Sequence, residues 1–202
     1  MPGTREVYIS VDVEADGPVP GRYSLVSLGA CVAAIRGADA DIEIIDPELH
    51  TFYRELKPIS EHWNPEALAV SGLTREQLEQ TGSEPAAAMT EFVAWVDEVG
   101  RTLRARPVFA AFPLAFDWQF TYFYVIIYAG RSPFGHSAHF DMKTAYSVLA
   151  GASVRDAVKR KMPPALLGSR RHTHNALDDA QGQADLLAGL LMWPTRAQPR
   201  AT

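Results

Sequence analysis

Two carboxylates, Asp12 and Glu14, occur two residues apart at the end of a segment in which apolar residues alternate with others (Val7, Ile9, Val11 and Val13). The alternation predicts a buried strand. Side chains two positions apart on a strand point to the same face, so both carboxylates project together. Because neighbouring anions repel each other and lose hydration, a cation stabilises the pair, and oxygen ligands favour Mg²⁺ or Mn²⁺ over zinc. This segment alone fits an exposed strand end with two solvated acids equally well.

A third acid, Asp117, interrupts an otherwise apolar stretch. It follows the short apolar segment Pro107 to Phe112 and precedes the aromatic run Trp118 to Tyr128. A buried carboxylate is costly unless it is paired or bound to a metal, so Asp117 needs a partner. The first turn of a helix, where acids are common, is the other interpretation. Both can hold together, because a first-turn aspartate can also point into a site.

A fourth acid, Asp179, lies five residues after His174 at the start of an apolar helix that continues to Leu191. This spacing lets the aspartate bind a metal from the helix while the histidine, on the preceding loop, takes a proton from water. Histidine suits that task because its pKa lies near neutrality. Taken alone, two histidines (His172 and His174) beside two aspartates are also typical of a solvated helix start.

Together these segments resemble the three motifs of the DEDDh exonuclease superfamily, which includes ribonuclease T, oligoribonuclease and the proofreading subunit of bacterial DNA polymerase III. The matching segments are D-V-E-A-D-G-P from Asp12, F-D at Phe116-Asp117, and H-N-A-L-D-D-A from His174. The stretch from Asn64 to Thr74 is also similar to the segment between the first two motifs in the ribonuclease T and proofreading branches. The resemblance covers the chain from about Val7 to Leu191, in matching order.

The resemblance implies a role for each motif residue. His174 would be the general base, and it is preferred to His172 because the pattern H-x-A-x-x-D fits only the register of His174. Two Mg²⁺ or Mn²⁺ ions roughly 4 Å apart would activate water and stabilise the leaving 3′ oxygen. The enzyme would then release 5′-mononucleotides from the 3′ end of single-stranded RNA or DNA. The implied metal ligands are four acids: Asp12, Glu14, Asp117 and Asp179.

Two further positions match family residues that touch the terminal nucleotide: Ala15, and Leu73 as a wedge against the base. An apolar residue after a glycine turn is also typical of plain core. One departure concerns the second motif, which in many relatives reads H-N-x-x-F-D. Here Phe112 and Pro113 replace the histidine and asparagine, which removes a polar group near the site but leaves the aspartate intact.

A basic segment between Arg155 and Arg171 precedes the third motif and contains six Lys or Arg against one acid. Beside a metal site, such a segment would guide the phosphate backbone, with Arg170 and Arg171 as candidate substrate contacts. A solvated helix face over Ser153 to Lys161 is the other interpretation. The net charge of −5 remains compatible with a nucleic-acid substrate if contact is limited to a few nucleotides and metal ions neutralise the phosphates.

The order of expected elements agrees with the α/β fold that the resemblance implies, a ribonuclease H-like exonuclease fold with a mixed five-stranded sheet flanked by helices. A helix is expected from Glu84 to Leu103, with its apolar stripe in the core. At 202 residues, we expect one exonuclease domain over 5–193, with 1–4 and 194–202 as flexible ends. The expected strands are Glu6 to Val13, Leu25 to Ile35, Thr51 to Leu56, Val108 to Phe112 and the segment around Phe140 to Met142.

Several expectations concern partners and location. The most apolar run, Phe120 to Ala129, is about half the length of a membrane span, so no membrane partner is expected. The absence of a signal peptide and the lone Cys31 favour the cytoplasm. The resemblance suggests a homodimer, for which the aromatic run is a candidate face. Two other functions remain open: a catalytically silent nucleic-acid-binding scaffold of this fold, and an endonuclease or phosphodiesterase with the same metal chemistry.

Overall fold

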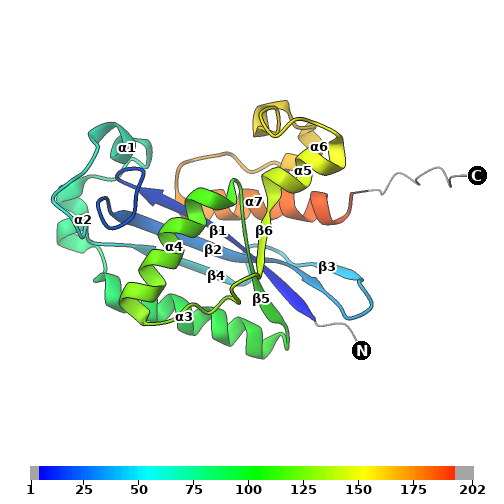
Figure 1. Cartoon of the computed structure of the whole chain (residues 1–202), viewed down its shortest axis with the longest axis horizontal. Helices are drawn as coiled ribbons and strands as arrows, with labels where there is room; N and C mark the ends of the chain where they lie inside the picture. Colours follow the sequence, from blue (N-terminus) through cyan, green and yellow to red (C-terminus); the bar gives the residue numbers. More distant parts are fainter. Residues whose placement is uncertain (1–4, 194–202) are drawn as a thin grey trace, which may run out of the picture.

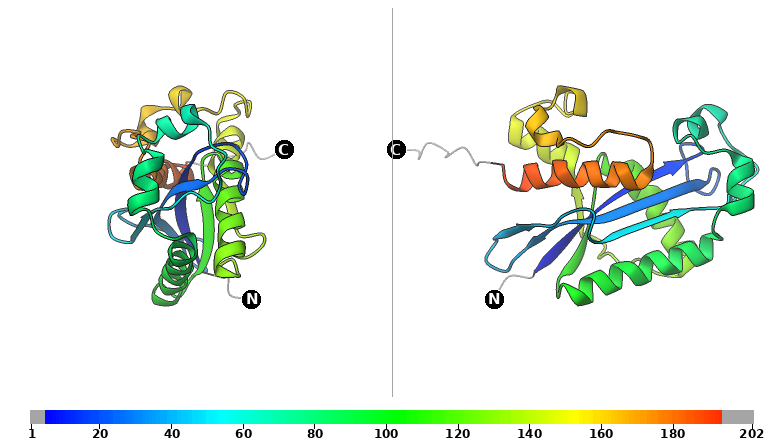
Figure 2. Two further views of the ribbon diagram at one scale, coloured as in Figure 1. Left: turned by 90° about the vertical axis from the view of Figure 1, so that its left-hand side faces the viewer. Right: turned by 180° about the vertical axis from the view of Figure 1, so that it is seen from behind.

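The computed structural model describes residues 5–193, and in them a twisted mixed sheet lies between two groups of helices (Figures 1 and 2). The expected flexible ends, 1–4 and 194–202, lie outside the described residues. None of the helices between 5 and 193 is long and apolar enough to cross a membrane.

The sheet contains every strand that the sequence predicts. In spatial order it runs β3-β2-β1-β5-β6, and β4 also pairs with β2. Strand β2 is antiparallel to β1, β3 and β4, whereas β1, β5 and β6 are parallel neighbours. The strands are β1 (Glu6–Ala15), β2 (Leu25–Arg36), β3 (Ile42–Ile44), β4 (Thr51–Glu55), β5 (Arg106–Ala111) and β6 (His139–Asp141).

The short strand β3 is an addition to the prediction. It pairs with 34–36 of β2, whereas β4 pairs with 27–31, so the two share the outer position beside β2. The sheet is therefore five strands wide, as expected, although six strands form it. Only three residues long and largely exposed, β3 carries no apolar alternation that could have predicted it.

Two helices cover one face of the sheet. They are α3 (Pro85–Thr102), the helix predicted from 84 to 103, and α4 (Leu114–Ala129). The odd-numbered residues of β1, from Val7 to Ala15, point into the apolar cluster beneath them, which includes Phe92 of α3 and Phe120 of α4. This face supplies the largest of the buried clusters. The even-numbered side of β1, which carries Asp12 and Glu14, faces away from it.

The opposite face carries α7 (Ala176–Leu191), with α5 (Met142–Ala150) and α6 (Pro164–Leu167) beside it. Between α5 and α6 the only helical residues are a 3₁₀ turn, η1 (Lys159–Lys161), so the continuous helical face considered for 153–161 is wrong. Two short helices, α1 (Pro65–Val70) and α2 (Arg75–Thr81), lie at the carboxyl end of β1 (Figure 1). The N–H of Asn64, which caps α1, donates to the carbonyl of Asp16 just beyond β1.

Helix α7 packs its backbone directly against the sheet where small residues face it. The Ser10 hydroxyl donates to the carbonyl of Ala180 at 2.8 Å, and the Cys31 thiol points to the same oxygen at 3.6 Å. A Cβ on Gly29 would stand 2.2 Å from the backbone of Ala176, so only glycine permits this approach. Gly29 is the partner of Asp12 in the β1–β2 pairing. The contact therefore holds the start of α7 directly beside the acidic end of β1.

We predict that Gly29→Ala displaces the start of α7, because backbone atoms of the helix cannot yield as a side chain can. Overpacking of this kind costs about 1–3 kcal/mol, and the shifted helix should weaken metal binding as well. Urea unfolding and Mn²⁺ titration calorimetry measure the two effects. Gly135→Ala is the matched control, since its Cβ would meet only the Ala138 side chain at an ordinary 3.5 Å. If the two variants had the same stability and the same affinity for Mn²⁺, glycine at position 29 would not be what permits the close approach of α7.

Candidate active site

The predicted acids converge from three separate segments at the carboxyl end of β1. Asp12 and Glu14 come from β1, Asp117 from the first turn of α4 and Asp179 from the first turns of α7. One ligand oxygen of Asp12, of Glu14 and of Asp179 can be chosen so that all lie within 4.8 Å of one another. An oxygen-only group of this kind has the donor chemistry that a hard divalent ion requires.

Asp117 is tied to the same strand end. Its side chain is buried, and Oδ1 accepts a hydrogen bond of 3.0 Å from the backbone N–H of Val13, the residue between Asp12 and Glu14. Both interpretations of the sequence therefore hold at once, since Asp117 is a first-turn acid of α4 and also points to the site.

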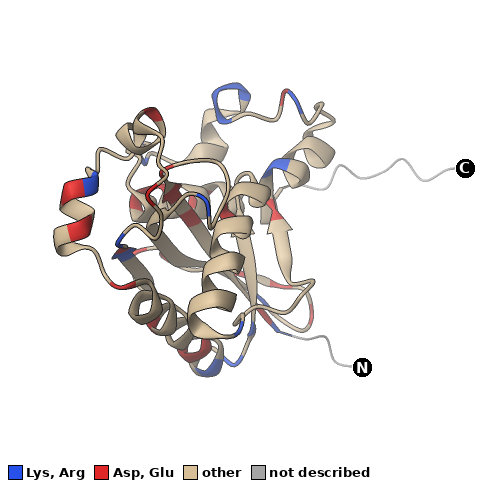
Figure 3. Ribbon diagram, turned by 60° about the vertical axis from the view of Figure 1, so that its left-hand side comes forward, with Lys and Arg blue, Asp and Glu red and all other residues tan. Residues whose placement is uncertain are grey.

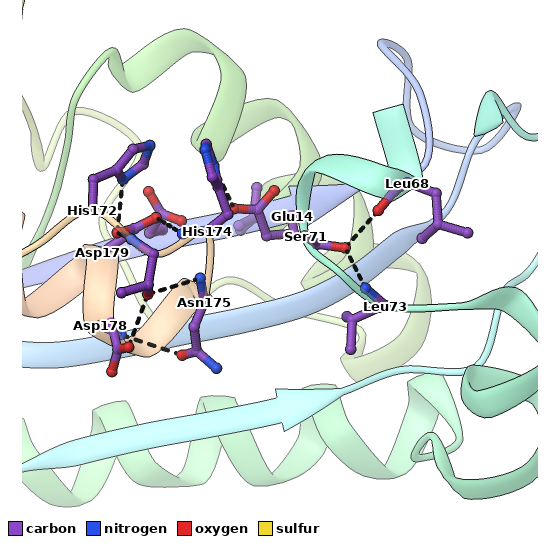
Figure 4. A network of polar contacts seen from close by, with 12 residues as sticks. Glu14, Leu68, Ser71, Leu73, His172, His174, Asn175, Asp178 and Asp179 are labelled. Atoms are coloured by element: carbon purple, nitrogen blue, oxygen red, sulfur yellow. Dashed lines mark hydrogen bonds and ion pairs between the residues drawn. The ribbon is translucent and has the colours of Figure 1, made fainter. Parts of the chain in front are cut away.

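The loop before α7 is held by Asp179 itself (Figure 4). Its two carboxylate oxygens accept the backbone N–H groups of Thr173 and His174, each at 3.0 Å. Asn175 caps the helix by accepting from the N–H groups of Leu177 and Asp178. His174 has a left-handed backbone with φ of 59°, which is unfavourable for a residue other than glycine. The hydrogen bond from the His174 N–H to Asp179 offsets that cost and holds the end of the loop at the start of α7.

Both histidines of this loop reach the acidic cluster. His174 Nδ1 is 4.0 Å from Glu14 Oε1, and His172 Nδ1 is 2.7 Å from Asp179 Oδ1. Their rings lie 4.2 Å apart and about half of each side chain is exposed. Both rings stand on the same side of the α7 start in Figure 4. Geometry alone therefore does not distinguish the two histidines as candidate bases, and the choice of His174 rests on motif register.

One buried residue of the site, Gln183, is not among those predicted from the sequence. Its side chain is fully buried, Nε2 donates to Asp12 Oδ1 at 2.6 Å, and Oε1 accepts from the N–H of Phe112 at 2.9 Å. Gln183 follows Asp179 by one helical turn, so the two share a face of α7. A polar residue at this spacing on the otherwise apolar side of the helix is the signal that could have identified it. It places a polar group beside the segment where Phe112 and Pro113 replace the usual His-Asn pair.

The predicted substrate contacts lie in different surroundings. Ala15 is buried at the end of β1, and Leu73 is half-buried against an apolar cluster that includes Leu68. Arg170 forms ion pairs with Glu48 at 3.0 Å and Asp185 at 3.4 Å, so much of its charge is already balanced. Arg171 is exposed and lines a cavity next to Asp179.

No family model matches the sequence. A curated relative does: the 3′-5′ DNA exonuclease Cap18 of Escherichia coli is 37% identical over 182 residues, which is 90% of this chain and 90% of the relative. The chain belongs to the DEDDh family of 3′-5′ exonucleases. The enzyme class inferred from the motifs is thereby confirmed.

Solved structures confirm the fold of this exonuclease. The nuclease domain of 3′hExo, described as a DEDDh family member bound to rAMP, has a TM-score of 0.64 at 12% identity and covers 92% of both chains. A 3′-exonuclease recognising a histone mRNA stem-loop has a TM-score of 0.67 at 12% identity, covering 94% of this chain and 64% of that one. Escherichia coli exonuclease I with a dT13 oligonucleotide has a TM-score of 0.62 at 14% identity, covering 92% and 40%.

The electrostatics of the exonuclease site favour a bound cation. Burial raises the pKa of Glu14 to about 7, and the charge of Asp179 adds to the effect. Burial also raises the pKa of Asp117 to about 8, although the hydrogen bond from Val13 opposes it. The pKa of Asp12 lies well above its usual range through burial and then through the charges of Asp117 and Glu14. Without a cation, this cluster therefore retains protons near neutral pH.

We predict that the metal-free protein loses stability as pH rises from about 5 to 8. A carboxyl whose pKa is raised on folding binds more protons in the folded state, so its contribution is full below the unfolded pKa and disappears through the folded pKa. The rise in the pKa of Glu14 alone, from 4.5 to about 7, corresponds to roughly 3 kcal/mol of free energy of unfolding. Thermal unfolding in a chelator measures this trend.

Asp12→Asn should raise the thermal unfolding midpoint of the metal-free protein at pH 8. The amide removes one repelling charge, and its oxygen can still accept the hydrogen bond from Gln183. Mn²⁺ should stabilise wild type increasingly from pH 6 to 8, as it displaces protons, and should hardly stabilise the variant. If the thermal unfolding midpoint of the metal-free protein rose with pH over this range, the carboxylates would not be a cluster of mutually repelling, buried groups.

Proposed function

We propose that this exonuclease removes 5′-mononucleotides from the 3′ end of a single strand by a two-metal mechanism with His174 as general base. The observation that carries the proposal is the convergence of four carboxylates at one strand end. Ligand oxygens of Asp12, Glu14 and Asp179 lie within 4.8 Å of one another, and Asp117 of α4 accepts from the N–H of Val13 on the same strand. Residues 5–193 would act as one exonuclease domain, because the buried clusters on both faces share the same sheet.

Asp12, Glu14, Asp117 and Asp179 would hold two Mg²⁺ or Mn²⁺ ions. When bound, such ions supply positive charge at the scissile phosphate and make water more acidic. A mixed group, His172, His174 and Asp179, also brings ligand atoms within 4.8 Å of one another. The oxygen-only group suits Mg²⁺ better than this nitrogen-containing one. The histidines are therefore left to proton transfer rather than to metal binding.

His174 would accept the proton of the attacking water. Its Nδ1 faces Glu14 at 4.0 Å, which leaves the other ring nitrogen to act as the base. Thr173 and His174 are anchored through their backbone to Asp179, so the ring is carried on a loop whose base is fixed to the metal site. Because the His174 ring is partly exposed, it would then release the proton to solvent.

The terminal nucleotide would enter between the carboxylates and the turn that carries Leu73. Gly72 has a φ of 70° and open space around it, and the Ser71 hydroxyl accepts the N–H of Leu73 at 3.3 Å (Figure 4). In this proposal Leu73 is the wedge against the last base. The backbone at Ala15, whose side chain is buried in the core, would contact the same nucleotide. Because the Escherichia coli relative is named a DNA exonuclease, we propose single-stranded DNA as the substrate, with RNA as the comparison.

Digestion of short 5′-labelled DNA and RNA strands with Mg²⁺ or Mn²⁺ tests this function. The expected result is a ladder that shortens by one nucleotide from the 3′ end, with DNA consumed faster than RNA. A circular single strand should resist cleavage. Cleavage of the circle would establish an endonuclease, and the absence of product with either metal would favour the silent scaffold.

We predict that His174→Ala binds Mn²⁺ and single-stranded DNA nearly as wild type but turns over about 10² to 10⁴-fold more slowly, the range for a lost general base. His172→Ala should lose much less, although it removes a contact to Asp179. Single-turnover rates across pH 6 to 9 decide between the two rings. A larger loss in His172→Ala would mean that the third motif is read in the wrong register.

The predicted homodimer stays a proposal. Its candidate face lies on α4, where Tyr122, Ile126 and Ile127 are exposed and line an apolar groove with Pro20. Light scattering across micromolar concentrations tests it, and a constant mass of about 22 kDa, that of one chain, would exclude the dimer.

A further inference from the structure

Three consecutive cations form the turn η1, and they lie in different surroundings. Figure 3 shows Lys and Arg gathered on the segment between α5 and α6. The Lys161 ammonium pairs with Asp156, and Arg160 is exposed. Lys159 is half-buried, with its ammonium 5.7 Å from the centroid of the Phe112 ring. Among residues 5–193, no carboxylate lies within ion-pair distance of Lys159, so its charge is available to a ligand.

Lys159 lines a cavity of about 200 Å³ that adjoins the metal site. Asp179 and His172 form part of its wall, and Arg160 and Arg171 add positive charge at its edge. The volume is below the roughly 300 Å³ of a small drug-sized pocket. The cavity therefore suits a phosphate group better than a whole nucleotide.

The charge of Lys159 acts on the catalytic carboxylates. It lowers the pKa of Asp12 and of Asp117, against the larger raising effect of burial. Because Lys159 lines the same cavity as Asp179, its charge repels a metal ion bound there. Its position is therefore unfavourable for metal binding alone, and an anion that arrives with the metals would make it favourable.

We propose that Lys159 contacts a phosphate of the substrate strand in this cavity, directly beside the metal site. The Phe112 ring stabilises the ammonium by a cation–π contact. Phe112 occupies the place of the histidine in the family's H-N-x-x-F-D pattern, so the Phe112–Lys159 pair belongs to this chain's version of the second motif. This inference rests on the proposed exonuclease function and names the residue that binds the backbone of its substrate.

A different role would be to offset the carboxylate charge when metal is absent. The two roles predict different results when the charge is removed. Without the phosphate role, Lys159→Gln would destabilise the metal-free fold and leave substrate binding unchanged. With it, the variant loses substrate affinity while Mn²⁺ binds as tightly as before, or more tightly because a repelling charge has gone.

The test compares Lys159→Gln and Lys159→Arg with Lys161→Gln as matched control. Lys161 lies in the same turn, carries the same charge and already has a partner in Asp156. Anisotropy of a fluorescent single strand, measured with Ca²⁺ in place of Mg²⁺, reports binding without relying on cleavage. Calorimetry with Mn²⁺ alone reports metal affinity.

We expect Lys159→Gln to weaken single-strand binding about tenfold, as for loss of a charged hydrogen bond, and to reduce the salt slope by about 0.7, the value for one phosphate contact on a single strand. Lys159→Arg should recover most of the affinity, and Lys161→Gln should match wild type. Unchanged affinity and salt slope in Lys159→Gln, an equal loss in Lys161→Gln, or weaker Mn²⁺ binding in Lys159→Gln would each overturn the inference.

The digestion ladder of wild type separates this inference from the proposed function. If wild type yields the ladder and Lys159→Gln binds normally, only the role of Lys159 is wrong. If wild type yields no ladder, the proposed function fails, and the binding comparison still decides whether Lys159 holds a phosphate.

Discussion

The close approach of α7 to β1 and β2 controls the geometry of the whole site. Glycine at position 29 and small side chains at Ser10 and Cys31 let the helix backbone lie directly on the sheet. Asp179 is thereby held against Asp12 and Glu14, and the helix cannot retreat without breaking contacts along its length. The carboxylates consequently cannot relieve their repulsion by moving apart. Protons or cations must do so instead, and this requirement connects the packing of the fold to its chemistry.

Hydrogen bonds orient three of the four carboxylates before any metal arrives. Gln183 holds Asp12, the Val13 N–H holds Asp117, and two loop N–H groups hold Asp179. A site fixed in this way loses little conformational freedom on binding, which favours both affinity and accurate placement of a phosphate. The histidine side chains differ, since both rings are about half exposed. The exposed rings leave both histidines open to exchange a proton with solvent.

Much of the site could be predicted from local patterns. The alternation before Asp12 and Glu14 determined which face of β1 they share, and the H-x-A-x-x-D spacing placed Asp179 at a helix start. The contact between His172 and Asp179 could not be foreseen, because it depends on the path of a loop that is fixed only when the N–H groups of Thr173 and His174 bind Asp179. Lys159 was one of six similar cations in sequence, and only folding distinguishes it from Lys161.

The central claim is that the carboxylate cluster, and not the histidine pair, holds the catalytic metals. Anomalous diffraction from crystals grown with Mn²⁺ tests it most directly. Two peaks roughly 4 Å apart, shared by Asp12, Glu14, Asp117 and Asp179, are expected. A single peak bound by His172, His174 and Asp179, or no peak beside β1, would contradict the account.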